Sequence, residues 1–200
     1  MMGVARGGGA AAALVLTERV TTAHALLVKI TAELNEPDLF QSGGRTAPCI
    51  GWHLWHIARW ADVMQASLPE ATPTLAERLG SRPQIWHARR LAAAWGLDPQ
   101  SLGHREAGSQ MEDESTLSMR FPGADALADY ASDAFGAADD AVRALDGVAL
   151  DEACEHFYGT QVGTTTVAYC VQFHAIHAYR HLGSIEALRG LLGMAGTATG

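Results

Sequence analysis

The sequence predicts an all-α protein, an antiparallel four-helix bundle in which one long crossover carries a short extra helix. Four segments of about twenty residues or more repeat apolar side chains at every third or fourth position, the period of a helix with one buried face. Alanine and leucine supply most of the apolar residues, which also favours helices. No segment shows the alternation of a strand. Helices of this length, each roughly 30 Å long, suit a single bundle domain, and 200 residues have room for one.

The first helix is expected over residues 12–34, and Pro37 helps to end it. Residues 1–11 are predicted to be a flexible leader. Arg6 followed by the small and apolar residues 7–16 has the outline of a signal peptide. The stretch opens with three glycines and lacks a clear cleavage site, so we expect no export. The apolar face of the helix consists of Val20, Ala23, Leu27, Ile30 and Leu34.

Three further helices are expected over residues 48–67, 125–145 and 164–192. The inner face of the helix over 125–145 is rich in alanine, which implies that a neighbouring helix approaches closely. Residues 193–200 are predicted to be a disordered tail, so the folded domain spans residues 12–192. The alanine-rich face consists of Leu127, Ala131, Ala134, Ala138, Val142 and Leu145.

The crossover is expected over residues 69–122, because Pro69 should end the preceding helix. Ser81 and Gln84 have the spacing of a capping box, so a short helix is predicted over residues 85–95. The rest of the crossover is predicted to be loop.

Composition excludes several classes of partner. The net charge is −8 and no basic cluster occurs, so we do not expect nucleic-acid binding. No stretch approaches about 18 consecutive apolar residues, so we expect no membrane span. The three cysteines, Cys49, Cys154 and Cys170, form no CxxC pair and cannot all be paired, which fits a reducing cytoplasm.

Five of the nine histidines lie in two helical windows, His53 and His56 in one and His174, His177 and His181 in the other. At about 100° per residue, the imidazoles of each window share one helix face. Several imidazoles on an otherwise apolar face need polar partners, and a metal ion satisfies them together. A histidine that stands alone on such a face is more often hydrogen-bonded within the core.

That alternative is the one we expect for His24 and His156, whereas His87 and His104 lie in the crossover and should be solvated. Trp60, one turn beyond His56, is expected to line a pocket beside the site. Cys170, one turn before His174, shares the histidine face and is a second candidate for the pocket lining. The other tryptophans are expected in the core or in the cavity wall; they are Trp52, Trp55, Trp86 and Trp95.

The string from Ile50 to Ala58, IGWHLWHIA, and the string from His177 to Ile185, HAYRHLGSI, resemble the DinB-like family of four-helix bundle proteins. That family shows a histidine before Leu/Ile-Ala in the second helix and an H-x-x-x-H-x-G-x-I pattern in the fourth. The resemblance covers roughly residues 12–192. It implies that His56, His177 and His181 bind one divalent metal ion at one end of the bundle.

Imidazole ligands leave the identity of the metal open between Zn, Ni and Fe. His53 and His174 depart from the family pattern, since each lies one turn before a matched histidine. Either residue is expected to replace a ligand, to add to the ligands, or to form a hydrogen bond with one.

Three neutral ligands leave a coordination position open, as in catalytic metal sites. A hydrolase would need a carboxylate base, but Asp62 and Glu186 point away from the histidine faces. A metal-bound thiolate needs less help. We therefore expect a metal-dependent transferase or isomerase that uses a low-molecular-weight thiol, in agreement with the best-understood members of the family.

The alternatives are a metal-dependent hydrolase and a non-enzymatic, metal-stabilised stress or interaction module. No catalytic residue is assigned, and an apolar outer stripe would suit a homodimer.

Overall fold

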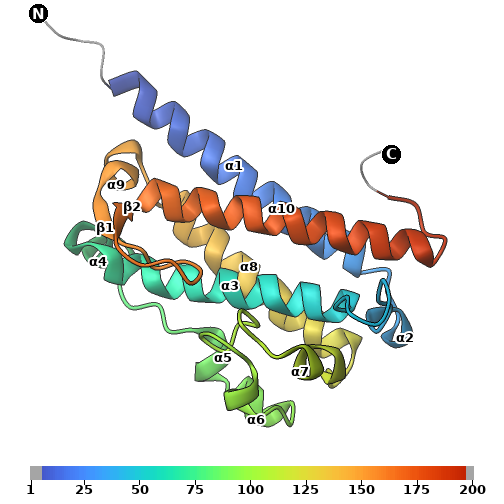
Figure 1. Ribbon diagram of the computed structural model, residues 1–200. Coiled ribbons are helices and arrows are strands. Elements are labelled where there is room, and N and C mark those ends of the chain that lie inside the picture. Colours follow the sequence, from blue (N-terminus) through green and yellow to red (C-terminus); the bar gives the residue numbers. More distant parts are fainter. Residues whose placement is uncertain (1–5, 197–200) are drawn as a thin grey trace, which may run out of the picture.

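The computed structural model describes residues 6–196, and it is mostly helical as predicted (Figure 1). Four long helices form its main body: each of α3 and α1 packs against both α8 and α10. Their bounds are α1 (Arg6–Thr31), α3 (Ile50–Ala71), α8 (Ala124–Arg143) and α10 (Val167–Leu191).

The remaining elements are short. They are α2 (Glu36–Leu39), α4 (Pro73–Leu79), α5 (Ile85–Ala88), α6 (Leu91–Ala94), the 3₁₀ helix η1 (Pro99–Ser101), α7 (Asp113–Ser118), α9 (Gly147–Asp151), β1 (Ala153–Glu155) and β2 (Thr164–Thr166).

The long helices do not simply alternate in direction. In Figure 1, α1 and α10 run one way across the molecule, and α3 and α8 run the opposite way. The packed pairs α3/α10 and α1/α8 are therefore antiparallel as predicted, whereas α1/α10 and α3/α8 are parallel. The parallel pair α3/α8 is possible because the long crossover between them returns the chain to the end at which α3 began.

The apolar faces predicted from the sequence are buried. Every residue of the two predicted faces, over 20–34 and 127–145, is at most 7% exposed, although Leu34 and Leu145 lie just beyond the ends of α1 and α8. Helix α3 is buried on nearly all sides, because it packs against α8 and α10 on one flank and against α4 and α5 of the crossover on another. Its buried residues include charged and polar side chains, among them Arg59 and Asp62, which therefore need partners inside the protein.

Helix α1 differs from its predicted bounds at both ends. It includes residues 6–11, which were expected in a flexible leader; residues 1–5 of that leader lie outside the described part of the chain. Its early turns pack against α9, where Gly9 and Gly147 come close enough that a Cβ on Gly9 would lie 3.2 Å from the Gly147 Cα. The residues expected to stop the helix instead begin α2, where Asn35 and Asp38 form a capping box.

One stretch of α1, Gly9–Thr31, is long and apolar enough to span a membrane by length and composition, contrary to the sequence-based expectation. Core helices and signal sequences have the same composition. Val20, Ala23 and Leu27 of this stretch are fully buried, so one of its faces belongs to the protein core.

Helix α3 extends past Pro69 to Ala71, so the prediction that this proline ends the helix is wrong. Leu68 and Pro69 are both buried, and their packing offsets the backbone hydrogen bond that proline cannot donate. The helix ends instead at Thr72, whose hydroxyl accepts a hydrogen bond from the Leu75 N–H and caps α4.

The crossover contains more structure than predicted. The expected helix over 85–95 is two helices, α5 and α6, separated at Arg90, which adopts a left-handed conformation with φ of 52°. The expected loop beyond it contains η1 and α7. The predicted capping box does not form, since Gln84 makes no capping hydrogen bond through its side chain.

A two-stranded antiparallel ribbon precedes α10 and was not predicted. Cys154 of β1 pairs with Thr165 of β2. Three-residue strands are too short to give a recognisable alternation in sequence. The ribbon matters for the site because the chain leaves β1 toward Tyr158, and because Thr166 at the end of β2 caps α10 by accepting from the Tyr169 N–H.

The predicted disordered tail, residues 193–200, begins where α10 ends; residues 193–196 contain no helix or strand, and residues 197–200 lie outside the described part of the chain.

Candidate metal centre

Three histidines from two helices meet in the structure. His56 lies in the second turn of α3, and His177 and His181 lie one turn apart on α10. The Nε2 atom of His177 is 3.1 Å from Nε2 of His56 and 2.9 Å from Nε2 of His181. One ring nitrogen of each histidine lies within 4.8 Å of the other two. The three histidines that the family resemblance implied as ligands are therefore close together in the structure.

The dimensions of this cluster suit a metal ion. Three nitrogens on one tetrahedral ion at about 2.0–2.1 Å lie about 3.3 Å apart. The two separations from Nε2 of His177 are a few tenths of an ångström shorter, so small rotations of the imidazoles bring these nitrogens to the spacing of metal ligands. The group consists of histidines alone among the described residues. Its chemistry therefore fits borderline ions such as Zn, Ni and Fe.

Burial keeps these imidazoles neutral. It lowers the pKa of His177 to about 4, with a further contribution from Arg180. Burial and then the neighbouring imidazole of His177 lower the pKa of His56. Burial, followed by the His56 and His177 imidazoles, lowers the pKa of His181. Neutral imidazole is the form that binds a metal, so no proton has to be displaced at neutral pH.

The two additional histidines, His53 and His174, lie beside the cluster, and both form hydrogen bonds. Nδ1 of His53 is 2.8 Å from Nδ1 of His181, so His53 contacts a predicted ligand on the side opposite its Nε2. His174 is fully buried, and both of its ring nitrogens have partners outside the cluster: Tyr158 at 2.8 Å and His24 at 2.8 Å. Of the roles left open by the sequence, the geometry supports that of hydrogen-bond partner of a predicted ligand for His53. His174 contacts no predicted ligand directly and reaches His177 only through the Tyr158 hydroxyl.

His56 is enclosed by groups that the sequence analysis did not connect with it. The Trp52 ring stacks on its imidazole, with centroids 4.6 Å apart and planes 12° apart. The crossover backbone at Ala107 and Gly108 lies against its Nδ1 atom: a Cβ on Gly108 would be 2.7 Å from that nitrogen. Gly108 has a φ of +85°, so both its conformation and the lack of space require glycine.

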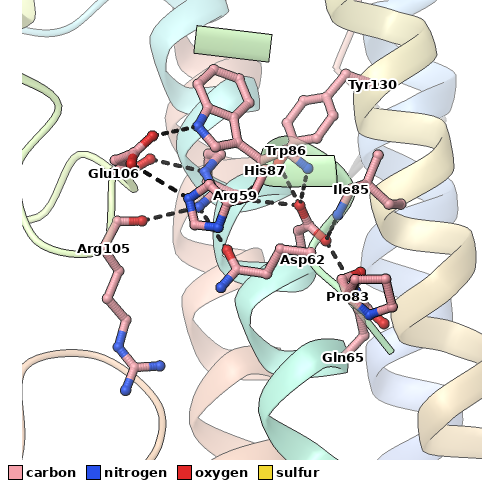
Figure 2. Close-up of polar contacts among 11 residues, drawn as sticks. Arg59, Asp62, Gln65, Pro83, Ile85, Trp86, His87, Arg105, Glu106 and Tyr130 are labelled. Carbon is pink, nitrogen blue, oxygen red and sulfur yellow. Dashed lines mark hydrogen bonds and ion pairs between the residues drawn. The ribbon is translucent and has the colours of Figure 1, made fainter. Parts of the chain in front are cut away.

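The loop that carries Gly108 is held by Arg59, one turn after His56 on α3. Figure 2 shows the Arg59 guanidinium between this loop and Asp62. It donates to the carbonyls of Arg105 and Glu106, at 2.9 Å each. Both of these residues have left-handed backbones, with φ of 55° and 51°. Arg59 therefore stabilises a strained turn that brings Gly108 onto His56.

Asp62 completes this buried network and joins α3 to the crossover. Arg59 and Asp62 are fully buried and 3.1 Å apart. The Asp62 carboxylate also accepts from the backbone N–H groups of Ile85, at 2.9 Å, and Trp86, at 2.8 Å, so a residue of α3 caps α5 (Figure 2). Tyr130 of α8 donates to the same carboxylate at 3.3 Å. An Arg/Asp pair three residues apart within an apolar run was the sequence signal for this network.

The network also settles the position of Asp62 relative to the histidines. Its two oxygens are occupied by α5, Gln65, Arg59 and Tyr130, so it faces away from the cluster as predicted.

The two predicted pocket-lining residues differ in their surroundings. The Trp60 ring lies 6.5 Å from the His177 ring and 4.8 Å from the Tyr158 ring, so it does border the cluster. Cys170 is fully buried, and its thiol interacts with Cys154 of the ribbon. Burial raises the pKa of that thiol, so it is not a reactive thiolate.

The other tryptophans and His24 are close to expectation. Trp52, Trp55 and Trp86 are buried, and Trp95 is partly buried. His24 is a hydrogen-bonded core residue as predicted, with Asp139 at 2.6 Å. The Asp139 side chain is only 15% exposed where it contacts His24.

His156, which was expected to be hydrogen-bonded in the core, is instead only partly buried, and neither of its ring nitrogens has a hydrogen-bond partner among the described residues. Of the two crossover histidines, His87 is half-exposed as predicted, whereas His104 is partly buried and stacks on Trp60.

Taken together, the fold and the site define a helical protein with a three-histidine cluster between its central helix and its last long helix. Residues 19–185 match the DinB superfamily, and the chain belongs to that superfamily. The crystal structure of a conserved protein from Enterococcus faecalis has a similar fold, with a TM-score of 0.63 and 14% sequence identity. The similarity covers 88% of this chain and 96% of that one. No curated protein matches the sequence.

Proposed function

We propose that this chain binds one divalent metal ion through His56, His177 and His181 and uses it in a transferase or isomerase reaction of a low-molecular-weight thiol. The observation that carries the proposal is the convergence of three neutral imidazole nitrogens within 4.8 Å. We include in the proposal that the four long helices form the predicted four-helix bundle, since this arrangement would hold α3 and α10 in the positions that the ligands need.

The ligand set favours this chemistry. Three protein ligands leave a position for an exogenous group, and a divalent ion at such a position holds a coordinated thiol as the thiolate. His177 and His181 are only partly buried, so a small molecule can approach from their side of the cluster. Trp60 and Trp52 supply apolar surface next to the imidazoles.

A thiol is favoured over water because of what surrounds the cluster. Hydrolysis at a metal centre usually requires a carboxylate that removes a proton from the attacking water. Among the described residues, no Asp or Glu joins the histidine group, and the carboxylate of Asp62 is engaged elsewhere. The hydrolase alternative therefore has less support.

The non-enzymatic alternative has one observation in its favour. A hollow of about 750 Å³ lies between the end of α3, the crossover and β1, but no histidine of the cluster lines it. A metal-stabilised module would need no route from such a hollow to the ion. The cytoplasmic location and the homodimer stay predictions from the sequence.

Metal content tests the proposal directly. We expect elemental analysis of the untagged protein to find about one divalent ion per chain, and the His181→Ala variant to lose it. His87→Ala is the matched control, because His87 is a half-exposed histidine of the crossover. Retention of the ion by His181→Ala, or its absence from the wild-type protein, would contradict the assignment of ligands.

Cobalt-substituted protein then separates the three functions. Addition of 2-mercaptoethanol should produce a sulfur-to-cobalt charge-transfer band if a thiol binds at the open position. Turnover of activated esters without thiol would instead indicate a hydrolase. A spectrum that responds to neither, with no turnover, would identify a structural metal.

A further inference from the structure

A continuous line of hydrogen bonds leads from His177 through the core to α8. Nδ1 of His177 is 2.9 Å from the Tyr158 hydroxyl, which is 2.8 Å from Nδ1 of His174. Nε2 of His174 is 2.8 Å from Nε2 of His24, and Nδ1 of His24 is 2.6 Å from the Asp139 carboxylate. The line joins the segment after β1 with α10, α1 and α8, and the three residues between its ends are at most 2% exposed.

The carboxylate at one end determines the direction of every bond. A carboxylate only accepts, so His24 carries a proton on Nδ1, and the Nε2 of a neutral His24 accepts from His174. His174 is then protonated on Nε2, and its Nδ1 accepts from the Tyr158 hydroxyl. The Tyr158 oxygen accepts in turn from Nδ1 of His177. Each residue has the one proton that this order requires, and His177 presents an unprotonated Nε2 to the cluster.

The reverse order needs either a protonated Asp139 or a His24 that is protonated on both ring nitrogens. The second carboxylate oxygen of Asp139 lies 3.6 Å from the guanidinium of Arg143, and the side chain is partly exposed. A guanidinium only donates, so each oxygen of Asp139 has a donor as its neighbour. The direction that frees Nε2 of His177 is therefore the one that the surroundings of Asp139 support.

We propose that Tyr158, His174, His24 and Asp139 are positioning residues, which hold His177 in the tautomer and orientation that present Nε2 to a metal ion. The inference rests on the proposed metal binding at His177. Metal-bound histidines usually donate their second N–H to an acceptor, and loss of that acceptor typically lowers metal affinity about 10–100-fold. In this chain the acceptor is a tyrosine, whose own orientation is set by a carboxylate three residues further along the line.

His181 begins a second and shorter line of hydrogen bonds, which consists of one contact with His53. Its Nδ1 is 2.8 Å from Nδ1 of His53, so a ligand that uses Nε2 can donate to His53. This second line ends at a partly exposed residue, so solvent can replace it. The Tyr158 line is buried from Tyr158 to His24, and water cannot easily take over its role.

The Tyr158→Phe variant tests the proposal, because it removes the hydroxyl and keeps the ring. Competition with a chromogenic chelator should show zinc affinity about 10–100-fold below wild type. Thr31→Val is the matched control: it removes another buried hydroxyl, which donates to the Leu27 carbonyl at 2.7 Å, and should leave zinc affinity unchanged. Equal affinities of Tyr158→Phe and wild type would overturn the inference.

A second measurement needs no metal. In metal-free wild-type protein, ¹⁵N NMR of the imidazoles should show protons on Nδ1 of His177, Nε2 of His174 and Nδ1 of His24. The opposite tautomers would overturn the inference even if zinc binds. If the tautomers are as expected but the wild-type protein binds no metal, the proposed function fails while the line of hydrogen bonds stands.

Asp139→Asn, at a partly exposed site, covers the case in which Tyr158→Phe does not fold. This variant should lower zinc affinity, and unchanged affinity and tautomers would contradict the role of Asp139.

Discussion

At the scale of single residues, His56 is the most enclosed of the three clustered histidines, with 4% of its surface exposed. Its ring lies between Trp52, which is one turn earlier on the same helix, and Gly108, which belongs to the crossover and is distant in sequence. The fit against Gly108 is so close that one added methyl group should displace the imidazole.

We therefore expect Gly108→Ala to weaken metal binding. The new Cβ would lie 2.7 Å from Nδ1 of His56 and 2.9 Å from the Trp55 ring, so the imidazole must move. Gly80→Ala is the matched control: Gly80 also has a positive φ, of +63°, but nothing lies within 4 Å of its Cβ position. Zinc affinity, measured with a competing chelator, should fall several-fold or more in the first variant only. Equal loss in both variants would attribute the effect to backbone strain.

At the scale of elements, α3 connects the site to the rest of the fold. Its His56 faces α10, and one turn later Arg59 faces the crossover and α8. The same helix therefore supplies a predicted ligand and the group that holds the loop against that ligand. A buried pair such as Arg59 and Asp62 is expensive to break, since removal of one charge leaves the other without compensation.

Arg59→Met should lower the free energy of unfolding by about 3–5 kcal/mol, because it leaves Asp62 charged and fully buried. The exposed pair of Arg78 and Asp146, 2.9 Å apart, provides the control. Arg78→Met should cost no more than about 1 kcal/mol. Urea denaturation of both variants measures the difference. Similar losses would show that burial does not decide the contribution of Arg59.

The elements also show how far sequence reasoning reached. The long helices and their buried faces follow from apolar spacing, which is local information. The crossover was predicted poorly, because its short helices are stabilised from outside: Asp62 of α3 caps α5, and Arg59 of α3 holds the turn at Arg105. No pattern within the crossover encodes those partners.

At the scale of the whole molecule, the histidine core should make the metal-free protein sensitive to acid. Burial lowers the pKa of His177 and of His53 to about 4, and it lowers the pKa of His56, His174 and His181 as well. In the unfolded chain these groups titrate near 6.5. The unfolded state therefore binds more protons than the folded state below pH 6.5.

Stability should accordingly be constant above about pH 6.5 and fall as the pH decreases toward 4. Each fully buried histidine contributes up to about 1.4 kcal/mol per pH unit, and the partly exposed His53 and His177 contribute less. Urea unfolding at pH 7, 6 and 5 in the presence of a chelator would measure this. A free energy of unfolding that does not change between pH 7 and 5 would contradict neutral, buried imidazoles. Excess zinc should oppose the loss at pH 6, because it binds only the folded state.

The sequence alone determined the helical class, the buried helix faces and the histidines that share a face within each of two helices, and the family resemblance indicated which three of them cluster. The reason is that positions three and four apart share a helix face whatever the rest of the chain does. The tertiary structure decided which faces meet: it made α3 parallel to α8, enclosed Asp62 with Arg59, placed Cys170 against the ribbon, and linked His24, Tyr158 and Asp139 to His177. Those contacts join residues far apart in the chain, so their geometry exists only once the helices have packed.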